Sequence, residues 1–114
     1  MITIIDYNAG NLTSVKRALD HLGIENCITP DPEVVSRAGR ILFPGVGHAG
    51  TAMAVLRQRG LDAALLEAFG RGIPMMGICV GAQVALTRSE EADTPCLGIL
   101  PGMCPRFELD DPWL

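Results

Sequence analysis

The sequence predicts an α/β fold built on an open, mostly parallel sheet with helices on both faces. Short runs rich in β-branched and aliphatic residues alternate along the chain with segments whose apolar residues recur every three or four positions. The short runs are nearly all apolar, which is typical of strands buried on both faces of a parallel sheet. No internal repeat, linker or low-complexity segment interrupts this alternation, so the 114 residues are expected to form one domain.

The first half of the chain contains three expected strands and two expected helices. The first helix follows the turn "NAGN", where Asn11 or Thr13 can cap it, and it ends at Gly23. The second, from "PDPEVV", has Asp31 as its N-cap and Pro32 at its first position. The apolar stripe of the first helix consists of Leu12, Val15, Leu19 and Leu22. The strands are "ITIIDY", "NCIT" and "RILF".

The second half continues the alternation. Residues 50–69 are predicted to form one or two helices broken near Gly60. The apolar anchors expected there are Met53, Leu56, Leu61, Leu65, Leu66 and Phe69. Next come a strand from "IPMMGI", a helix from "VGAQVALT", the polar loop "RSEEADTP" and a fifth strand from "LGIL". The apolar stretch 73–86 contains proline, glycines and glutamine and is too short to span a bilayer, so we expect it to be core.

Composition and charge exclude several classes of protein. A net charge of -4 and 4% aromatic residues provide neither a basic surface nor stacking platforms for nucleic acid. The four cysteines form no CxxC pair and no His/Cys cluster, so neither structural zinc nor a disulfide scaffold is expected. The start "MITIIDY" lacks the basic region of a signal peptide. We therefore expect a cytoplasmic protein with reduced thiols, no membrane contact, no metal and no organic cofactor.

The segment "GICVGAQ" places Cys79 between Gly77 and Gly81 at a predicted strand-to-helix junction. At such a junction, the pattern G-x-C-x-G is that of a nucleophile elbow. This turn is so sharp that its central residue is strained and that bulky residues two positions away would clash. The turn lifts the sulfur above the carboxyl edge of the sheet, where open α/β folds bind ligands. The helix start favours the thiolate, and the N–H of Val80 can stabilise an oxyanion. The alternative is a small buried cysteine in a glycine-rich helix start.

A second loop, "PGVG" at residues 44–47, follows another predicted strand. Its backbone N–H groups can come to the same edge of the sheet and supply a second oxyanion donor. Taken alone, this loop also fits an ordinary tight turn. Because both loops follow buried strands in the expected order, the sequence favours an acyl-transfer site with a cysteine nucleophile.

Over residues 1–107 the sequence also resembles a known family. The segments "IIDYNAGNLTSVKRAL", "ILFPGVG", "GIPMMGICVGAQVAL", "SEEAD", "LGILPG" and "RF" follow one another as in the glutaminase subunits of imidazole glycerol phosphate synthase. These are class I, triad-type glutamine amidotransferases with a flavodoxin-like sheet. The resemblance implies hydrolysis of L-glutamine to glutamate and ammonia, with ammonia delivered to a cyclase subunit, in a heterodimer that serves histidine biosynthesis. It also implies that residues 1–114 are the amino-terminal part of a single amidotransferase domain.

The resemblance assigns roles to individual residues. Cys79 matches the nucleophile, and the N–H of Val80 matches one oxyanion donor. Gln83 resembles the residue that helps to hold the substrate glutamine. The positions that look like the oxyanion strand are Gly45, Val46 and Gly47.

The general base is the component that the sequence does not supply. The family continues beyond "RF" to a histidine and a glutamate, spaced H-x-E, that complete the triad, whereas here "ELDDPWL" follows "RF". His21 lies on the first predicted helix and is expected to be solvated or at an interface. His48 follows the oxyanion loop without an acid two residues beyond it, so it is more simply a solvated loop residue than a substitute base.

Two classes of function therefore stay open. The first is the amino-terminal part of a glutaminase, inactive alone because thioester chemistry needs a base. The second is a non-catalytic remnant that acts, if at all, as a partner-binding module. A cysteine variant of an α/β-hydrolase fits less well because the elbow comes too early in the chain.

Overall fold

The structure is a computed structural model that describes residues 1–8, 11–108 and 110. Four parallel strands form the main sheet, in the order β2-β1-β3-β4. A second, three-stranded sheet has the order β6-β5-β7. The first nine elements are β1 (Ile2–Ile5), α1 (Leu12–His21), β2 (Asn26–Thr29), α2 (Pro32–Ser36), β3 (Ile41–Gly45), α3 (Ala49–Gln58), α4 (Leu61–Gly70), β4 (Met75–Cys79) and α5 (Val80–Val84). The remaining four are β5 (Arg88–Ser89), η1 (Glu91–Asp93), β6 (Thr94–Pro95) and β7 (Met103–Cys104).

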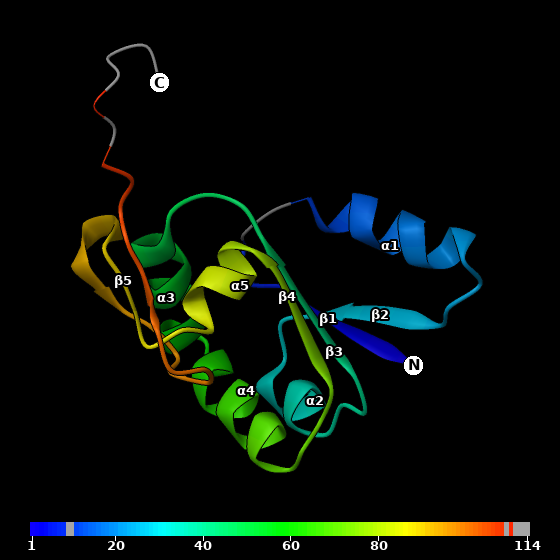
Figure 1. Cartoon of the computed structure of the whole chain (residues 1–114). Helices are drawn as coiled ribbons and strands as arrows, with labels where there is room; N and C mark the ends of the chain where they lie inside the picture. Colours follow the sequence, from blue (N-terminus) through cyan, green and yellow to red (C-terminus); the bar gives the residue numbers. More distant parts are fainter. Residues whose placement is uncertain (9–10, 109, 111–114) are drawn as a thin grey trace.

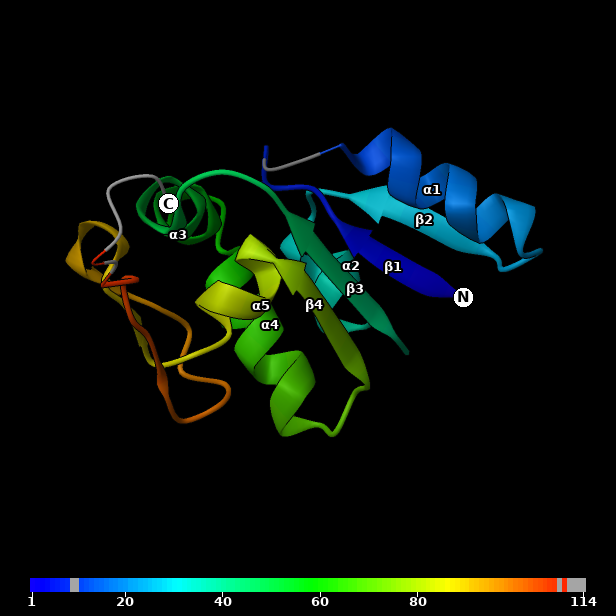
Figure 2. The same ribbon diagram turned by 45° about the horizontal axis from the view of Figure 1, so that its top comes forward.

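Helices cover both faces of the main sheet, so the predicted fold class is confirmed. Helix α1 lies on one face, and α2 to α5 lie on the other (Figures 1 and 2). The alternation of side chains along each strand explains this division. In β3, Leu42 packs with Leu19 of α1, whereas its neighbour Phe43 joins the larger core under α2 to α5. Two separate apolar clusters therefore hold the helices to the sheet.

The predicted helix boundaries are confirmed wherever a capping residue indicated them. The Asn11 side chain accepts a hydrogen bond from Ser14 N, and the Asp31 side chain accepts one from Glu33 N. Gly60 separates α3 from α4 with a φ of 71°. The predicted turn at 8–11 and the chain after Glu108 lie largely outside the described residues.

Three residues predicted to be apolar anchors are instead exposed. Leu22 comes after the last turn of α1, as its C-cap, so it leaves the stripe that faces the sheet. Leu66 and Phe69 lie on α4, where Leu61 and Leu65 are the residues buried against the core. The helical spacing correctly identified α4, but it included two residues beyond the buried stripe.

The prediction that residues 73–86 are core is wrong for β4. The sheet order places β4 at an edge, and α1 lies on the β1 and β2 side of the sheet (Figure 2). Met76 is therefore 62% exposed and Ile78 is 44% exposed. Both lie on the α1 face, where they border an apolar groove of about 470 Å³ with Leu19 and Leu42.

The predicted strand "LGIL" is also wrong, because its backbone groups bond to the end of α5. The N–H groups of Leu97, Gly98 and Leu100 donate to the carbonyls of residues 84, 86 and 85. The last carbonyls of a helix have no partner within it, so this segment stabilises the end of α5. Its N–H groups are therefore not paired with a neighbouring strand. The strands of this region, β5 and β6, instead form within the predicted polar loop.

Candidate active site

The turn between β4 and α5 has the strained geometry predicted for a nucleophile elbow. Cys79 is the last residue of β4, and its backbone has φ 56° and ψ −117°. This conformation is costly for any residue other than glycine and is concentrated at functional sites. The Cys79 side chain is exposed, so the alternative of a small buried cysteine is wrong.

The two glycines of the elbow are required by close backbone approach. A Cβ at position 77 would lie 2.8 Å from the backbone N and Cα of Ala82. A Cβ at position 81 would overlap the carbonyl oxygen of Phe43 on β3. Since both obstacles are backbone atoms, neither can move aside easily. The steric reason given for the G-x-C-x-G pattern is therefore confirmed.

The loop after β3 leaves the sheet directly beside the elbow. Gly45, the last residue of β3, is paired in register with Cys79 across the parallel ladder. Gly45 is buried, whereas the next residue, Val46, is 61% exposed. Gly47 has a φ of 105°, which an L side chain rarely adopts. The structure thus brings the start of the 45–47 loop next to the thiol.

Val80 begins α5, with its side chain buried in the core. The N–H groups of the first helical turn have no partner within a helix, so the N–H of Val80 is available beside the thiol. The start of α5 and the start of the 45–47 loop thus both adjoin Cys79 in the backbone. Preorganised N–H groups around a nucleophile are the feature that stabilises an oxyanion in acyl transfer.

The Gln83 side chain binds the segment around η1. Its amide Nε2 donates to Ser89 Oγ at 2.6 Å and to Glu91 Oε2 at 3.3 Å. The other carboxylate oxygen of Glu91 accepts a hydrogen bond from Ala49 N at 3.1 Å. Glu91 therefore joins α5 to the start of α3.

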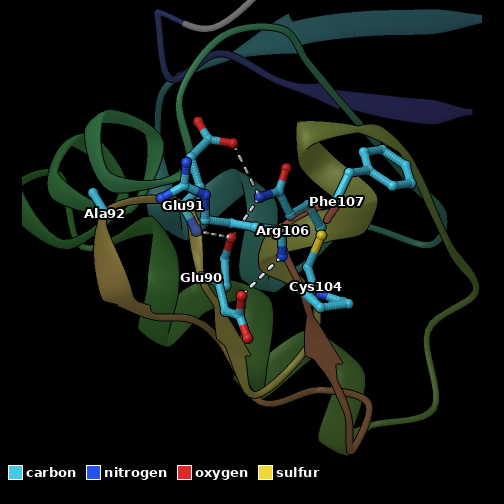
Figure 3. A pocket seen from close by; sticks show the side chains of 9 residues that line it. Glu90, Glu91, Ala92, Cys104, Arg106 and Phe107 are labelled. Atoms are coloured by element: carbon cyan, nitrogen blue, oxygen red, sulfur yellow. Dashed lines mark hydrogen bonds between the residues drawn. The ribbon is translucent and has the colours of Figure 1, made fainter. Parts of the chain in front are cut away.

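These residues border a cavity of about 480 Å³ between η1 and the chain after β7 (Figure 3). The backbone N of Arg106 donates to Glu90 Oε2 at 2.9 Å, which ties the chain after β7 to the other side of the cavity. The residues that line the cavity are Gln83, Ser89, Glu90, Glu91, Ala92, Cys104, Pro105, Arg106 and Phe107. Cys79 is not among the residues that line this cavity.

His48 is the N-cap of α3 rather than a freely solvated loop residue. Its Nδ1 accepts a hydrogen bond from Gly50 N at 3.0 Å. Its Nε2 lies 3.7 Å from Glu91 Oε1. Both ring nitrogens are therefore directed at partners other than Cys79, which argues against a substitute base.

Tyr7 is a buried residue of this region that the sequence analysis did not identify. Its side chain is 1% exposed, and its hydroxyl has no hydrogen-bond partner among the described residues. Burial raises the pKa of the Tyr7 hydroxyl, and the negative charge of a Cys79 thiolate raises it further. The hydroxyl therefore stays protonated. The ring packs on Phe43, with centroids 5.2 Å apart.

Neither Tyr7 nor Glu91 has a spacing pattern that would have identified it. Glu91 occurs in a run of charged residues that is typical of a solvated loop, and only the fold brings it to Gln83. In the described part of the chain, no group of three or more His, Cys, Asp or Glu side chains is arranged to hold a metal ion. None of the helices there is long and apolar enough to cross a membrane.

Comparisons with known proteins agree with this geometry. The family model "Glutamine amidotransferase class-I" matches residues 3–92, a span that includes the elbow and the 45–47 loop. A solved structure described as a glutamine amidotransferase superposes with a TM-score of 0.78 at 23% identity, covering 93% of this chain and 57% of its own. At that identity the match supports the fold alone.

Two curated relatives are more similar in sequence, and both are named imidazole glycerol phosphate synthase subunit HisH. The relative from Desulfovibrio desulfuricans is 53% identical over 108 residues, which are 95% of this chain and 50% of the relative. The relative from Nitratidesulfovibrio vulgaris is 55% identical over 107 residues, 94% of this chain and 50% of the relative. The chain thus spans about half the length of these relatives. Elbow, sheet order and family match lead to one conclusion: the chain belongs to the class I glutamine amidotransferases.

Proposed function

We propose that this chain carries the nucleophile half of a glutaminase. Cys79 Sγ attacks the side-chain amide carbon of L-glutamine, and the carbonyl oxygen becomes a tetrahedral oxyanion. N–H groups of Val80 and of the 45–47 loop stabilise that charge. The C–N bond then breaks, the leaving nitrogen takes up a proton as ammonia, and water hydrolyses the thioester to glutamate.

The observation that carries this proposal is the pairing of Gly45 with the strained Cys79. This pairing at one edge of the sheet supports Cys79 as the nucleophile and the adjoining backbone N–H groups as oxyanion donors. A structural cysteine requires neither a positive φ nor a glycine-lined approach to a neighbouring strand. Acyl transfer requires both a raised nucleophile and nearby donors.

Gln83 and Glu91 are proposed to hold the substrate. The Gln83 Nε2 is used by Ser89 and Glu91, so its carbonyl oxygen is the atom available as an acceptor. That oxygen and the Glu91 carboxylate form an acceptor pair suited to the α-ammonium of an amino acid.

The general base is proposed to come from the part of the family fold that this chain does not span. His48 is occupied as a helix cap, so it is a poor candidate. The resemblance assigns the base to an H-x-E segment. Supplied with that segment, the elbow would complete a triad, and without it the chain is expected to be nearly inactive.

The proposed metabolic role is delivery of ammonia to a cyclase subunit, in a cytoplasmic heterodimer of histidine biosynthesis with overall lyase chemistry. The names of the HisH relatives support this role. The second candidate is a non-catalytic partner-binding module, favoured by the exposed Met76 and Ile78 of β4.

A chloroketone analogue of L-glutamine tests the proposal without requiring turnover. The thiolate displaces chloride from the analogue, and peptide mass spectrometry locates the new C–S bond. We expect the bond at Cys79, with protection by excess L-glutamine but not by L-glutamate. The label should be absent in Cys79→Ser and retained in the matched control Cys27→Ser. Labelling spread over the other cysteines, or no protection by glutamine, would favour the binding module.

A further inference from the structure

Tyr7 lies beneath the elbow, one residue beyond the hydrogen-bonded end of β1. Asp6 N still donates to Thr29 O at 2.9 Å, so the backbone that carries Tyr7 remains tied to the sheet. The ring packs against Phe43 at an interplanar angle of 53°. The side chain is thus held rigidly on β3, the strand that leads into the 45–47 loop.

The hydroxyl of this ring is directed at the end of β3. A Cβ at Gly45 would overlap Tyr7 Oη and lie 3.0 Å from Cζ, so the hydroxyl occupies the space beside the Gly45 Cα. The same Cβ would be 3.4 Å from Gly81 N, which places this position between the loop and the elbow. Tyr7 Oη therefore lies where the two halves of the proposed oxyanion site meet.

A buried hydroxyl that has no hydrogen-bond partner among the described residues is unusual. Buried polar atoms are nearly always hydrogen-bonded, and each exception in a native protein needs an explanation. Leaving the group unpaired costs stability, so a phenylalanine would pack more favourably unless the hydroxyl has a role in another state. Burial first, and a Cys79 thiolate second, raise the pKa of the Tyr7 hydroxyl, so the two groups are electrostatically coupled.

We infer that Tyr7 is a positioning residue for the nucleophile: its hydroxyl, held beside Gly45 and next to the elbow, is placed to donate to the thiolate of Cys79 when that thiolate forms. The inference rests on the proposed function, and it adds a side-chain dipole to the backbone donors already described. Because the hydroxyl is buried and its ring is held against Phe43, only the O–H bond has to turn toward the sulfur when the thiol ionises. Burial raises the pKa of the Tyr7 hydroxyl, so the phenol keeps its proton and can donate it in a hydrogen bond while the thiol ionises.

Alkylation kinetics of the whole chain test this inference. Iodoacetamide labelling is followed at each cysteine by mass spectrometry between pH 5 and pH 10, with Cys104 as the internal reference. Tyr7→Phe is expected to slow labelling of Cys79 at pH 7 by about tenfold and to move the midpoint of its pH profile up by about one unit. The rate at high pH should not change, because the thiolate itself is equally reactive there.

Thr3→Val is the matched control, since Thr3 is a buried hydroxyl residue on β1 away from the elbow. It should leave the Cys79 profile unchanged. An unchanged profile in a folded Tyr7→Phe variant would overturn the inference and leave the proposed function intact. An unreactive Cys79 in the unsubstituted chain would instead overturn the proposed function.

A second measurement avoids the substitution altogether. Tyr7 is the only tyrosine of the chain, so biosynthetic incorporation of 3-fluorotyrosine places one ¹⁹F nucleus beside Gly45. The ¹⁹F chemical shift should follow pH with the same midpoint as the alkylation of Cys79. That transition should vanish in Cys79→Ser and persist in Cys27→Ser. A ¹⁹F shift insensitive to the ionisation of Cys79 would contradict the inference.

Discussion

The carbonyl oxygen of Phe43 occupies the space that a side chain at Gly81 would need. This contact joins the end of β3 to the first turn of α5, and so it fixes the height of the elbow above the sheet. Because the obstacle is backbone, relief would require β3 or α5 to move. The distance between the 45–47 loop and Cys79 therefore depends on the absence of one methyl group.

Gly81→Ala should strongly destabilise the chain for that reason. We expect a loss of about 3 kcal/mol in the free energy of unfolding, at the upper end of the range for overpacked sites. Gly70→Ala is the matched control, because its Cβ would meet no atom within 4 Å and Gly70 is in α4. The control should gain about 0.5 kcal/mol from better helix propensity. Equal stability of the two variants in urea titrations would contradict the close approach.

Cys79 should be the fastest cysteine to alkylate at neutral pH. It is the exposed thiol of the four, whereas Cys27 is half-buried in β2. Burial raises the pKa of the Cys96 thiol, so Cys96 keeps its proton to higher pH and should react slowly. Time-resolved mass spectrometry with iodoacetamide would measure all four rates in one sample. Faster labelling of Cys27 or Cys96 would contradict the elbow geometry.

His48→Ala should act on stability and not on the thiol. Loss of the side-chain bond to Gly50 N removes the cap of α3, which is expected to cost about 1 kcal/mol. The rate of Cys79 alkylation and any release of glutamate from glutamine should both stay unchanged. His21→Ala, at the exposed end of α1, is the control and should alter neither quantity. A His48-dependent release of glutamate would instead identify His48 as a base.

The chain should self-associate through the uncovered side of β4. Met76 and Ile78 expose apolar area on β4, which is also an edge strand, and both features favour pairing with a second copy. Met76→Lys is expected to lower the average mass measured by light scattering. Leu22→Lys, an equally exposed apolar site off the groove, should have little effect. A monodisperse monomer for the unsubstituted chain would refute this expectation and show that the described fold is self-sufficient.

The sequence predicted the parts of the fold that local chemistry determines. Capping residues such as Asn11 and Asp31 carry their own hydrogen-bond partners nearby, so the helix starts were predictable. The exposure of Met76 was not predictable, because an apolar strand has the same sequence pattern whether it lies in the centre or at the edge of a sheet. Sheet order, which determines that difference, depends on contacts distant in sequence.

The candidate site likewise contains residues that the sequence could predict and residues that it could not. The elbow was predictable because Gly77, Cys79 and Gly81 are close in sequence and their spacing has a steric cause. Glu91 and Tyr7 were not, since each reaches the region only through folding, from η1 and from the end of β1. The charged run around Glu91 and the apolar run before Tyr7 have simpler local explanations.

The hydrogen bonds from residues 97, 98 and 100 to the end of α5 make the elbow part of a larger cooperative unit. A helix of five residues has too few internal bonds to persist alone, so α5 depends on that later segment. Local opening should therefore release both together, and slow amide hydrogen exchange at Leu97 would report on the order of the nucleophile turn. The backbone geometry at Cys79 therefore persists only as long as the hydrogen bonds from residues 97, 98 and 100 to the end of α5 remain closed.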